Sequence, residues 1–381
     1  MKYFNLILPL LFASLEVSAQ KTALTPQVNT DTITNFSTYK RSITFGGLLQ
    51  TRFVGSLTPN VDVNGKNFDP TLSTSKITNT FLLKRARFVV KGTVNDHFSA
   101  NLLVNFAEFN SDPANKVLEN AFIKYTLNKY LNVQAGQFRP FFGIEDAVPN
   151  DIIRTLDYSN QYYAFGASGW QSFQTGVTIF GNIDPNGTFR YYAGVYNGNN
   201  RNQATDNDNT KNVYGRVETD LLKTVTFGLN AAQGSFGTGT GNALGVDVKS
   251  GLVLNKYWEL SLGGEYKTGT NFALYNTLLV KPTLSDVRMQ GFYVFPIVRY
   301  NYNTRRVRAI EFSSRYEYFN ENYKLDHNSR QTIIPNVSLI FADDFYAALQ
   351  LGVAIDMYQH TVPLTTANNH NLAYLQFQVR F

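Results

Sequence analysis

The stretch HNLAYLQFQVRF, residues 370–381, decides the fold of this chain. Its apolar and polar residues alternate, so that Leu375, Phe377 and Val379 fall on one side and Gln376 and Gln378 on the other. Alternation with a period of two is the property of a β-strand that has one apolar face. A segment of this length and pattern, ending on an aromatic residue, predicts a lipid-facing strand of a membrane β-barrel.

Residues 1–19 have the features of a cleavable export signal. Lys2 precedes an apolar run over 6–13, and the small residues before and at Ala19 suit a signal peptidase. The alternative is an anchor helix, but the apolar run is shorter than the ~20 residues that a membrane span requires. We predict cleavage after Ala19, a polar N-terminal segment over 20–42, and an outer-membrane barrel over 43–381.

The composition narrows the possible functions. The absence of cysteine excludes disulfides and thiolate chemistry. The net charge is +6, but Lys and Arg are spread singly and form no polybasic run, so selection of anionic solutes is favoured over nucleic-acid binding. The 23 Tyr and 30 Phe, against 12 Pro, favour strands.

Sixteen segments of alternating pattern follow one another along the chain. We expect strands at 43–54, 81–94, 97–109, 117–127, 130–138, 170–181, 188–197, 212–222, 224–235, 243–254, 256–267, 287–300, 306–319, 331–341, 344–358 and 370–381. Very short connections alternate with longer ones that are rich in Asn, Gly, Thr or Asp. An even strand number with short turns on one side and long loops on the other predicts an all-β fold, a sixteen-stranded antiparallel transmembrane β-barrel.

The parity of charged residues predicts which face of each strand points inward. In the segment 81–94, one parity carries Arg85, Arg87 and Lys91, and the other carries Leu82, Ala86, Phe88 and Val90. A Lys or Arg facing lipid at the midplane costs about 2–4 kcal/mol. We therefore expect Arg85, Arg87 and Lys91 to face the lumen, and by the same argument Arg52, Arg315 and Arg380.

Four large aromatic residues lie near the ends of predicted strands. They are Trp170, Tyr257, Trp258 and Phe295. Such residues form girdles at the two membrane interfaces of barrels, and ordinary strand packing is the alternative.

The longest predicted loop, 139–169, begins with the motif GQFRPFFGIE over residues 136–145. Pro140 cannot continue strand pairing, and Gly143 permits a sharp reversal of the chain. A loop this long in a compact fold is usually functional. We expect it to fold into the barrel, with Arg139 and Arg154 at the constriction. It also carries the acids Glu145, Asp146, Asp151 and Asp157, and the aromatic residues Phe141, Phe142, Tyr158, Tyr162 and Tyr163, which we expect to pack against the inner wall.

The motif over 136–143 resembles that of the phosphate-selective porin O and P family. The opening FGGLLQ at 45–50, the paired arginines at 85 and 87, and LENAF at 118–122 resemble the same family. The resemblance implies a sixteen-stranded trimeric porin whose third long loop folds inward to narrow the channel. In place of the ladder of arginines and lysines that lines the best-known members, the loop here has mixed charge.

These observations predict passive diffusion of small, anionic, phosphate-like solutes through a water-filled channel in the cell outer membrane. The expected pore-lining residues are Arg52, Arg85, Arg87, Lys91, Arg139, Arg154, Arg315 and Arg380. The expected partners are outer-membrane lipids, small anionic solutes and two further copies of the chain, without nucleic acid, cofactor or metal. The alternative is a barrel that acts as an adhesin or receptor through its long loops. We expect no catalytic activity, because the four histidines are scattered and no Gly-x-Ser-x-Gly motif is present.

Overall fold

The computed structural model describes residues 41–71, 76–110, 117–147, 153–203, 205–206, 209–235, 239–302, 304–342 and 346–381. The predicted signal peptide over 1–19 lies outside the described residues, as do Asp151 and all but the last two residues of the segment 20–42.

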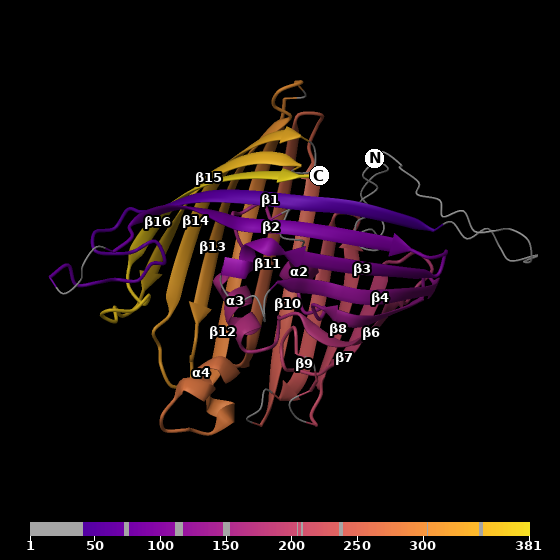
Figure 1. The fold of residues 1–381 in the computed structure, drawn as a ribbon, viewed down its shortest axis with the longest axis horizontal. Coiled ribbons are helices and arrows are strands. Elements are labelled where there is room, and N and C mark those ends of the chain that lie inside the picture. The colour runs from indigo at the N-terminus through magenta and orange to yellow at the C-terminus, as the bar shows by residue number, and fades with distance from the viewer. Residues whose placement is uncertain are drawn as a thin grey trace, which may run out of the picture.

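Sixteen antiparallel strands form a closed barrel in which each strand pairs with its neighbours in the sequence and β1 pairs with β16 (Figure 1). The strands are β1 (Ser42–Ser56), β2 (Asn79–Thr93), β3 (Phe98–Asn105), β4 (Leu118–Asn128), β5 (Leu131–Phe138), β6 (Gln174–Asn182), β7 (Phe189–Tyr196), β8 (Asn212–Leu222), β9 (Val225–Ser235), β10 (Thr240–Val253), β11 (Trp258–Thr270), β12 (Arg288–Asn301), β13 (Ala309–Asn320), β14 (Arg330–Ala342), β15 (Ala347–Tyr358) and β16 (His370–Arg380). The predicted all-β barrel of sixteen antiparallel strands is confirmed.

Short helices occupy the connections. They are η2 (Phe106–Asn110), α2 (Ile144–Ala147), α3 (Asn160–Ala167), α4 (Phe272–Thr277) and η4 (Leu284–Asp286). Among the described residues, no helix has the length and apolar character needed to span a membrane.

The connections differ in length at the two ends of the barrel. At the end that holds the start of β1 and the end of β16, the links include 94–97, 129–130, 223–224 and 254–257. At the other end they include 57–78, 139–173, 271–287 and 359–369. Short turns are periplasmic and long loops extracellular in outer-membrane barrels, so this difference orients the chain in the membrane.

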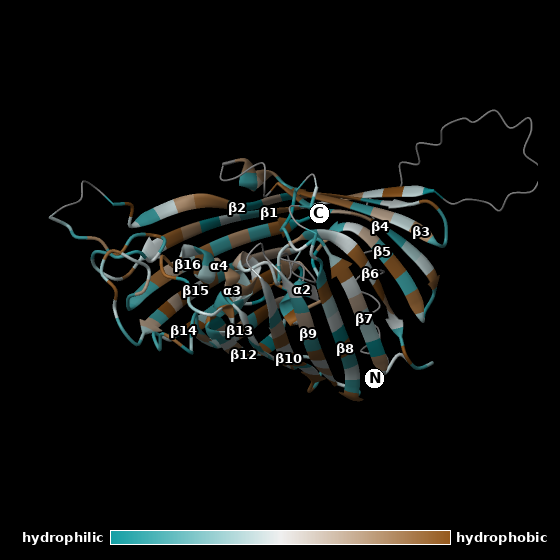
Figure 2. Ribbon diagram, turned by 90° about the horizontal axis from the view of Figure 1, so that it is seen from below, coloured by the Kyte–Doolittle hydropathy of each residue, from teal (hydrophilic) through white to brown (hydrophobic). Residues whose placement is uncertain are grey.

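Burial alternates along the strands as the sequence predicts, and Figure 2 shows the matching alternation of hydropathy along the ribbons. On β13, Glu311, Arg315 and Glu317 are buried, whereas Phe312 between them is 52% exposed on the outer surface. The buried parity therefore faces the lumen, and the exposed apolar parity faces lipid.

The alternation is interrupted in β2, which is one of several places in the described barrel where the strand register shifts. Arg85 pairs with Gln50 and Leu83 pairs with Thr51, which leaves Lys84 as the extra residue of a bulge in β2. Residues that face each other across antiparallel strands share a face, so Leu82, opposite the buried Arg52, lies on the inner side. The sequence assigned Leu82 to lipid, and that prediction is wrong because the bulge shifts the register by one residue.

The predicted aromatic girdle is half correct. Tyr257 and Trp258 are exposed at the start of β11. Trp170 is fully buried in the long loop against Phe272, with ring centroids 5.4 Å apart. Phe295 lies in the middle of β12 on the inward parity, with its ring 5.7 Å from that of Tyr293. Trp170 lies in the loop because β6 begins at Gln174 and not at residue 170, whereas Phe295 faces inward because it has the parity of the buried Tyr293 in the middle of its strand.

Candidate functional site

The long loop leaves β5 at Phe138 and turns at once into the barrel. Pro140 follows the last paired residue, and Gly143 adopts φ +125°. A Cβ atom at Gly143 would lie 1.7 Å from Oε1 of Glu265, a side chain of the inward parity of β11. Only glycine therefore permits this close approach of the loop to the inner wall.

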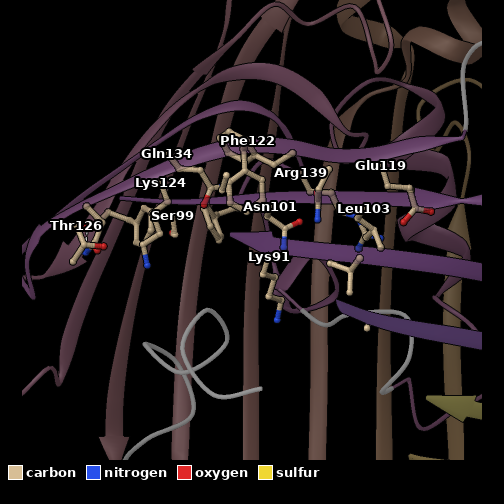
Figure 3. Close-up of a pocket in the computed structure, with 18 of the residues that line it drawn as sticks. Lys91, Ser99, Asn101, Leu103, Glu119, Phe122, Lys124, Thr126, Gln134 and Arg139 are labelled. Atoms are coloured by element: carbon tan, nitrogen blue, oxygen red, sulfur yellow. Dashed lines mark hydrogen bonds between the residues drawn. The ribbon is translucent and has the colours of Figure 1, made fainter. Parts of the chain in front are cut away.

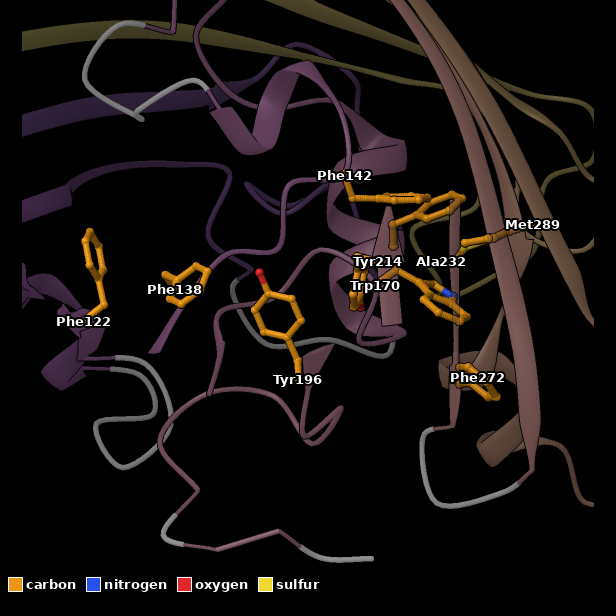
Figure 4. Packing of buried hydrophobic residues seen from close by; sticks show 11 residues of the cluster. Phe122, Phe138, Phe142, Trp170, Tyr196, Tyr214, Ala232, Phe272 and Met289 are labelled. Atoms are coloured by element: carbon orange, nitrogen blue, oxygen red, sulfur yellow. The ribbon is translucent and has the colours of Figure 1, made fainter. Parts of the chain in front are cut away.

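Apolar side chains attach one side of the loop to the strands from β4 to β12 (Figure 4). Phe142, Phe165 and Trp170 are fully buried in this cluster. The indole Nε1 of Trp170 donates to the main-chain oxygen of Thr270 at 2.8 Å, which satisfies its one polar atom. Burial of such rings contributes roughly 1.5–3 kcal/mol each, so this cluster fixes the loop on that side of the lumen.

Ion pairs attach the other side of the loop to β1 and β2. The carboxylate of Asp157 lies 3.1 Å from Nη1 of Arg52, 2.9 Å from Nζ of Lys84 and 2.9 Å from Nη2 of Arg85. Burial alone would raise the pKa of Asp157, but these three cations outweigh it and hold the pKa well below its usual range. Asp157 is therefore ionised and neutralises part of the charge of its three partners.

Two further arginines attach the same part of the loop to β13. Arg315 donates to Oγ1 of Thr155 at 2.7 Å and to the main-chain oxygen of Tyr158 at 2.9 Å, while its Nε donates to Glu317 at 2.6 Å. Arg154 donates to both carboxylate oxygens of Glu311, at 2.9 and 2.6 Å. Such bidentate pairs fix geometry as well as charge.

Two acids of α2 lie in a different environment from Asp157. Glu145 accepts hydrogen bonds from the main-chain nitrogen of Ser159 at 2.7 Å and from its hydroxyl at 2.5 Å, and Ser159 also caps α3. Asp146 accepts from Nε2 of Gln171 at 2.7 Å. Burial raises the pKa of both carboxyl groups, that of Asp146 to about 7, although Lys267 opposes the shift.

A cavity of about 600 Å³ lies on the periplasmic side of the loop (Figure 3). Among the described residues that line it, eight are basic and three are acidic. The basic residues are Arg87, Lys91, Lys124, Lys129, Arg139, Arg190, Arg216 and Arg380, and the acidic ones are Glu119, Asp146 and Glu218. The lining therefore has a surplus of positive charge.

Part of that charge is compensated by ion pairs on the wall. Arg87 contacts Glu119 at 2.7 Å, and Glu218 lies 3.1 Å from Arg190 and 2.6 Å from Arg216. The other basic residues of the lining are Lys91, Lys124, Lys129, Arg139 and Arg380.

Arg139 is held at the boundary between loop and cavity. Its Nη1 donates to the hydroxyl of Tyr158 at 2.8 Å, and its guanidinium lies 4.6 Å from the ring centroid of Phe173. Arg201, in the loop between β7 and β8, has its guanidinium 5.2 Å from the same ring centroid. These contacts fix the position of the Arg139 charge.

The eight residues proposed from the sequence thus fall into two groups. Arg87, Lys91, Arg139 and Arg380 line the cavity. Arg52, Arg85, Arg154 and Arg315 instead hold the long loop or its neighbouring acids.

Sequence reasoning missed further basic residues of the lumen, among them Lys84, Lys124, Arg190 and Arg216. The last three have inward parity in strands that were correctly placed, so parity alone would have found them. Lys84 could not be found, because the bulge that turns it inward has no signal in the alternation.

The comparisons with known proteins agree with this geometry. The family model for phosphate-selective porins O and P matches residues 57–242. No curated protein matches the chain by sequence.

Several solved structures share the fold at low sequence identity. The outer-membrane channel DcaP of Acinetobacter baumannii has a TM-score of 0.59 at 11% identity, over 90% of this chain and 97% of its own. The trimer form of OmpT, an outer-membrane protein of Vibrio cholerae, has 0.55 at 14%, over 90% and 99%. An anion-selective porin from Comamonas acidovorans has 0.54 at 11%, over 90% and 99%. The resemblance to the phosphate-selective porin O and P family is therefore confirmed over residues 57–242, and the chain is an outer-membrane β-barrel with the fold of a porin.

Proposed function

We propose that this porin channel prefers small anions and that its selectivity is set in the cavity on the periplasmic side of the long loop. The observation that carries the proposal is the eight-to-three excess of basic over acidic side chains in the cavity lining. A low-dielectric wall with charge of one sign concentrates ions of the opposite sign, and lumen charge sets the selectivity of a diffusion channel.

The four arginines that hold the loop contribute less to selectivity than their number indicates. Arg52, Arg85, Arg154 and Arg315 each have a carboxylate close by, so the solute meets ion pairs there. Lys91, Lys124, Arg139 and Arg380 line the cavity and are candidates for anion contact there. Phosphate-like anions fit them by charge, as the name of the matching family indicates.

The test is the zero-current potential of the purified protein in a planar bilayer with a salt gradient. The double change of Lys91→Gln and Lys124→Gln should move this potential toward cation preference. Lys249→Gln is the matched control, because Lys249 has inward parity on β10 but does not line the cavity. An equal shift in the control and the double variant would contradict the assignment of selectivity to this cavity.

We also propose that the barrel functions as a homotrimer, as the trimer form of OmpT indicates for that related fold. Mass measurement of the detergent complex before and after heat denaturation tests this proposal. The same bilayer recordings address the alternative of an adhesin or receptor, which predicts a barrel without open-channel current.

A further inference from the structure

We propose that the cavity holds a specific site for anionic carbohydrates, such as sugar phosphates or sugar acids. This inference rests on the proposed anion channel and names the class of solute that the cavity recognises. Its starting point is a platform of three aromatic rings that line the cavity, Phe141, Phe180 and Tyr192.

The three rings contact one another. Phe180 and Tyr192 are opposite each other on β6 and β7 and stack with an interplanar angle of 12° and centroids 6.0 Å apart. Phe141, from the start of the long loop, lies 4.7 Å from Tyr192 and 5.7 Å from Phe180. A channel that only passes hydrated ions does not require such rings, because apolar ring faces in the lumen cannot replace the water around an ion.

The platform is rigid. The hydroxyl of Tyr192 donates to Glu218 at 3.4 Å, and Glu218 is itself held by Arg190 and Arg216. Phe141 is fixed by its neighbour Phe142, which is fully buried in the aromatic cluster. A rigid platform binds without ordering its own side chains, and this lowers the entropic cost of binding.

A cation and an amide lie beside the platform. The Nζ atom of Lys124 lies 5.3 Å from the ring centroid of Phe180, and Lys124 pairs across the strands with Gln134. Gln134 is 1% exposed, and its Oε1 has no hydrogen-bond partner among the described residues. Oε2 of Glu119, 3% exposed and also in the lining, is a second buried acceptor in the same condition.

Buried polar atoms are normally satisfied, and these two acceptors have no hydrogen-bond donor among the described residues. Hydroxyl groups of a ligand provide such donors. The apolar C–H face of a sugar ring suits the electron-rich face of an aromatic ring, and a phosphate or carboxylate group suits Lys124. A sugar ring with one anionic group satisfies all three features, whereas inorganic phosphate leaves the aromatic rings without a partner and an aryl anion without hydroxyl groups leaves the acceptors unsatisfied.

The test is current block by glucose 6-phosphate in bilayers that contain the purified full-length protein. We expect glucose 6-phosphate to reduce the current by half at a concentration about fivefold lower than inorganic phosphate or glucose alone requires. We call this concentration the half-block concentration. The variant Phe141→Leu/Phe180→Leu should raise the half-block concentration for glucose 6-phosphate about fivefold. Phe295→Leu is the control, since this ring has inward parity but lies outside the cavity lining.

Equal block by glucose 6-phosphate and phosphate, or no difference between the platform variant and Phe295→Leu, would overturn the proposal. Stronger block by phenyl phosphate than by glucose 6-phosphate would also overturn it, in favour of an aryl-anion site. Failure of the anion channel itself is seen separately, as a cation-selective zero-current potential in the same recordings.

Discussion

Oδ1 of Asp157 accepts a hydrogen bond from Nη2 of Arg85 at 2.9 Å, joining the middle of the long loop to the inner face of β2. Arg52 and Lys84 contact the same carboxylate, so one acid of the loop holds three cations of the wall. The loop is therefore attached to this side of the barrel by charge and to the other side by aromatic packing.

Removal of the charge of Asp157 should weaken this attachment and expose positive charge. We expect Asp157→Asn to lower the free energy of unfolding by about 2 kcal/mol, because buried cations lose their counterion. The zero-current potential should move toward stronger anion preference. Urea unfolding in detergent and bilayer recordings measure the two effects.

Asp184→Asn serves as the control for that change, since Asp184 lies in the exposed link between β6 and β7. If both variants behave alike, Asp157 does not hold the loop.

The two arginines of the loop should differ in their effect on selectivity. Arg139 lines the cavity, whereas Arg154 is paired with Glu311 at 2.6 Å. Arg139→Gln should therefore shift the zero-current potential toward cations clearly more than Arg154→Gln does. The same salt gradient is applied to both variants, and a larger shift for Arg154→Gln would reverse the assignment of the two roles.

Asp146 should make selectivity depend on pH. Burial raises its pKa to about 7, while Lys267 and Arg139 oppose the shift and Glu265 adds to it. Because burial raises the pKa of Asp146, the observed position of the loop is stabilised when this carboxyl group is neutral. That stabilisation is present at acidic pH and is lost as the pH rises through about 7.

Ionisation of Asp146 also adds negative charge to the cavity wall. Anion preference should therefore fall between about pH 5.5 and about pH 8.5, and Asp146→Asn should remove that step. Zero-current potentials across this range measure it, and an unchanged step in the variant would show that another group titrates.

The bulge in β2 predicts opposite environments for two consecutive residues. Lys84 faces the lumen and contacts Asp157, whereas Leu83 is 46% exposed on the outer surface. A cysteine at position 84 should react with a charged, water-soluble thiol reagent and reduce the current, and one at position 83 should not. Equal reaction at both positions would be incompatible with the bulge.

The sequence predicted the barrel well because alternation is a local property. The segment 212–222 coincides with β8, and parity assigned Arg87 and Arg315 to the inner face, where both are buried. The segment 97–109 was too long, since β3 ends at Asn105 and the chain continues as η2. Nothing in the alternation marks that ending.

The candidate site was less predictable because its contacts join distant parts of the chain. Asp157 meets Arg52 and Arg85 only after the barrel closes and the loop enters it. One local signal could have been used: Arg216 and Glu218, like Arg315 and Glu317, stand two residues apart on one face and form ion pairs at 2.6 Å. That spacing predicts compensated charge on the wall.

The central claim is that the lumen prefers anions, and the zero-current potential of the unmodified protein across a KCl gradient at neutral pH tests it most directly. The excess of basic over acidic residues in the cavity predicts a potential with the sign of chloride preference. A potential with the sign of potassium preference would contradict the account.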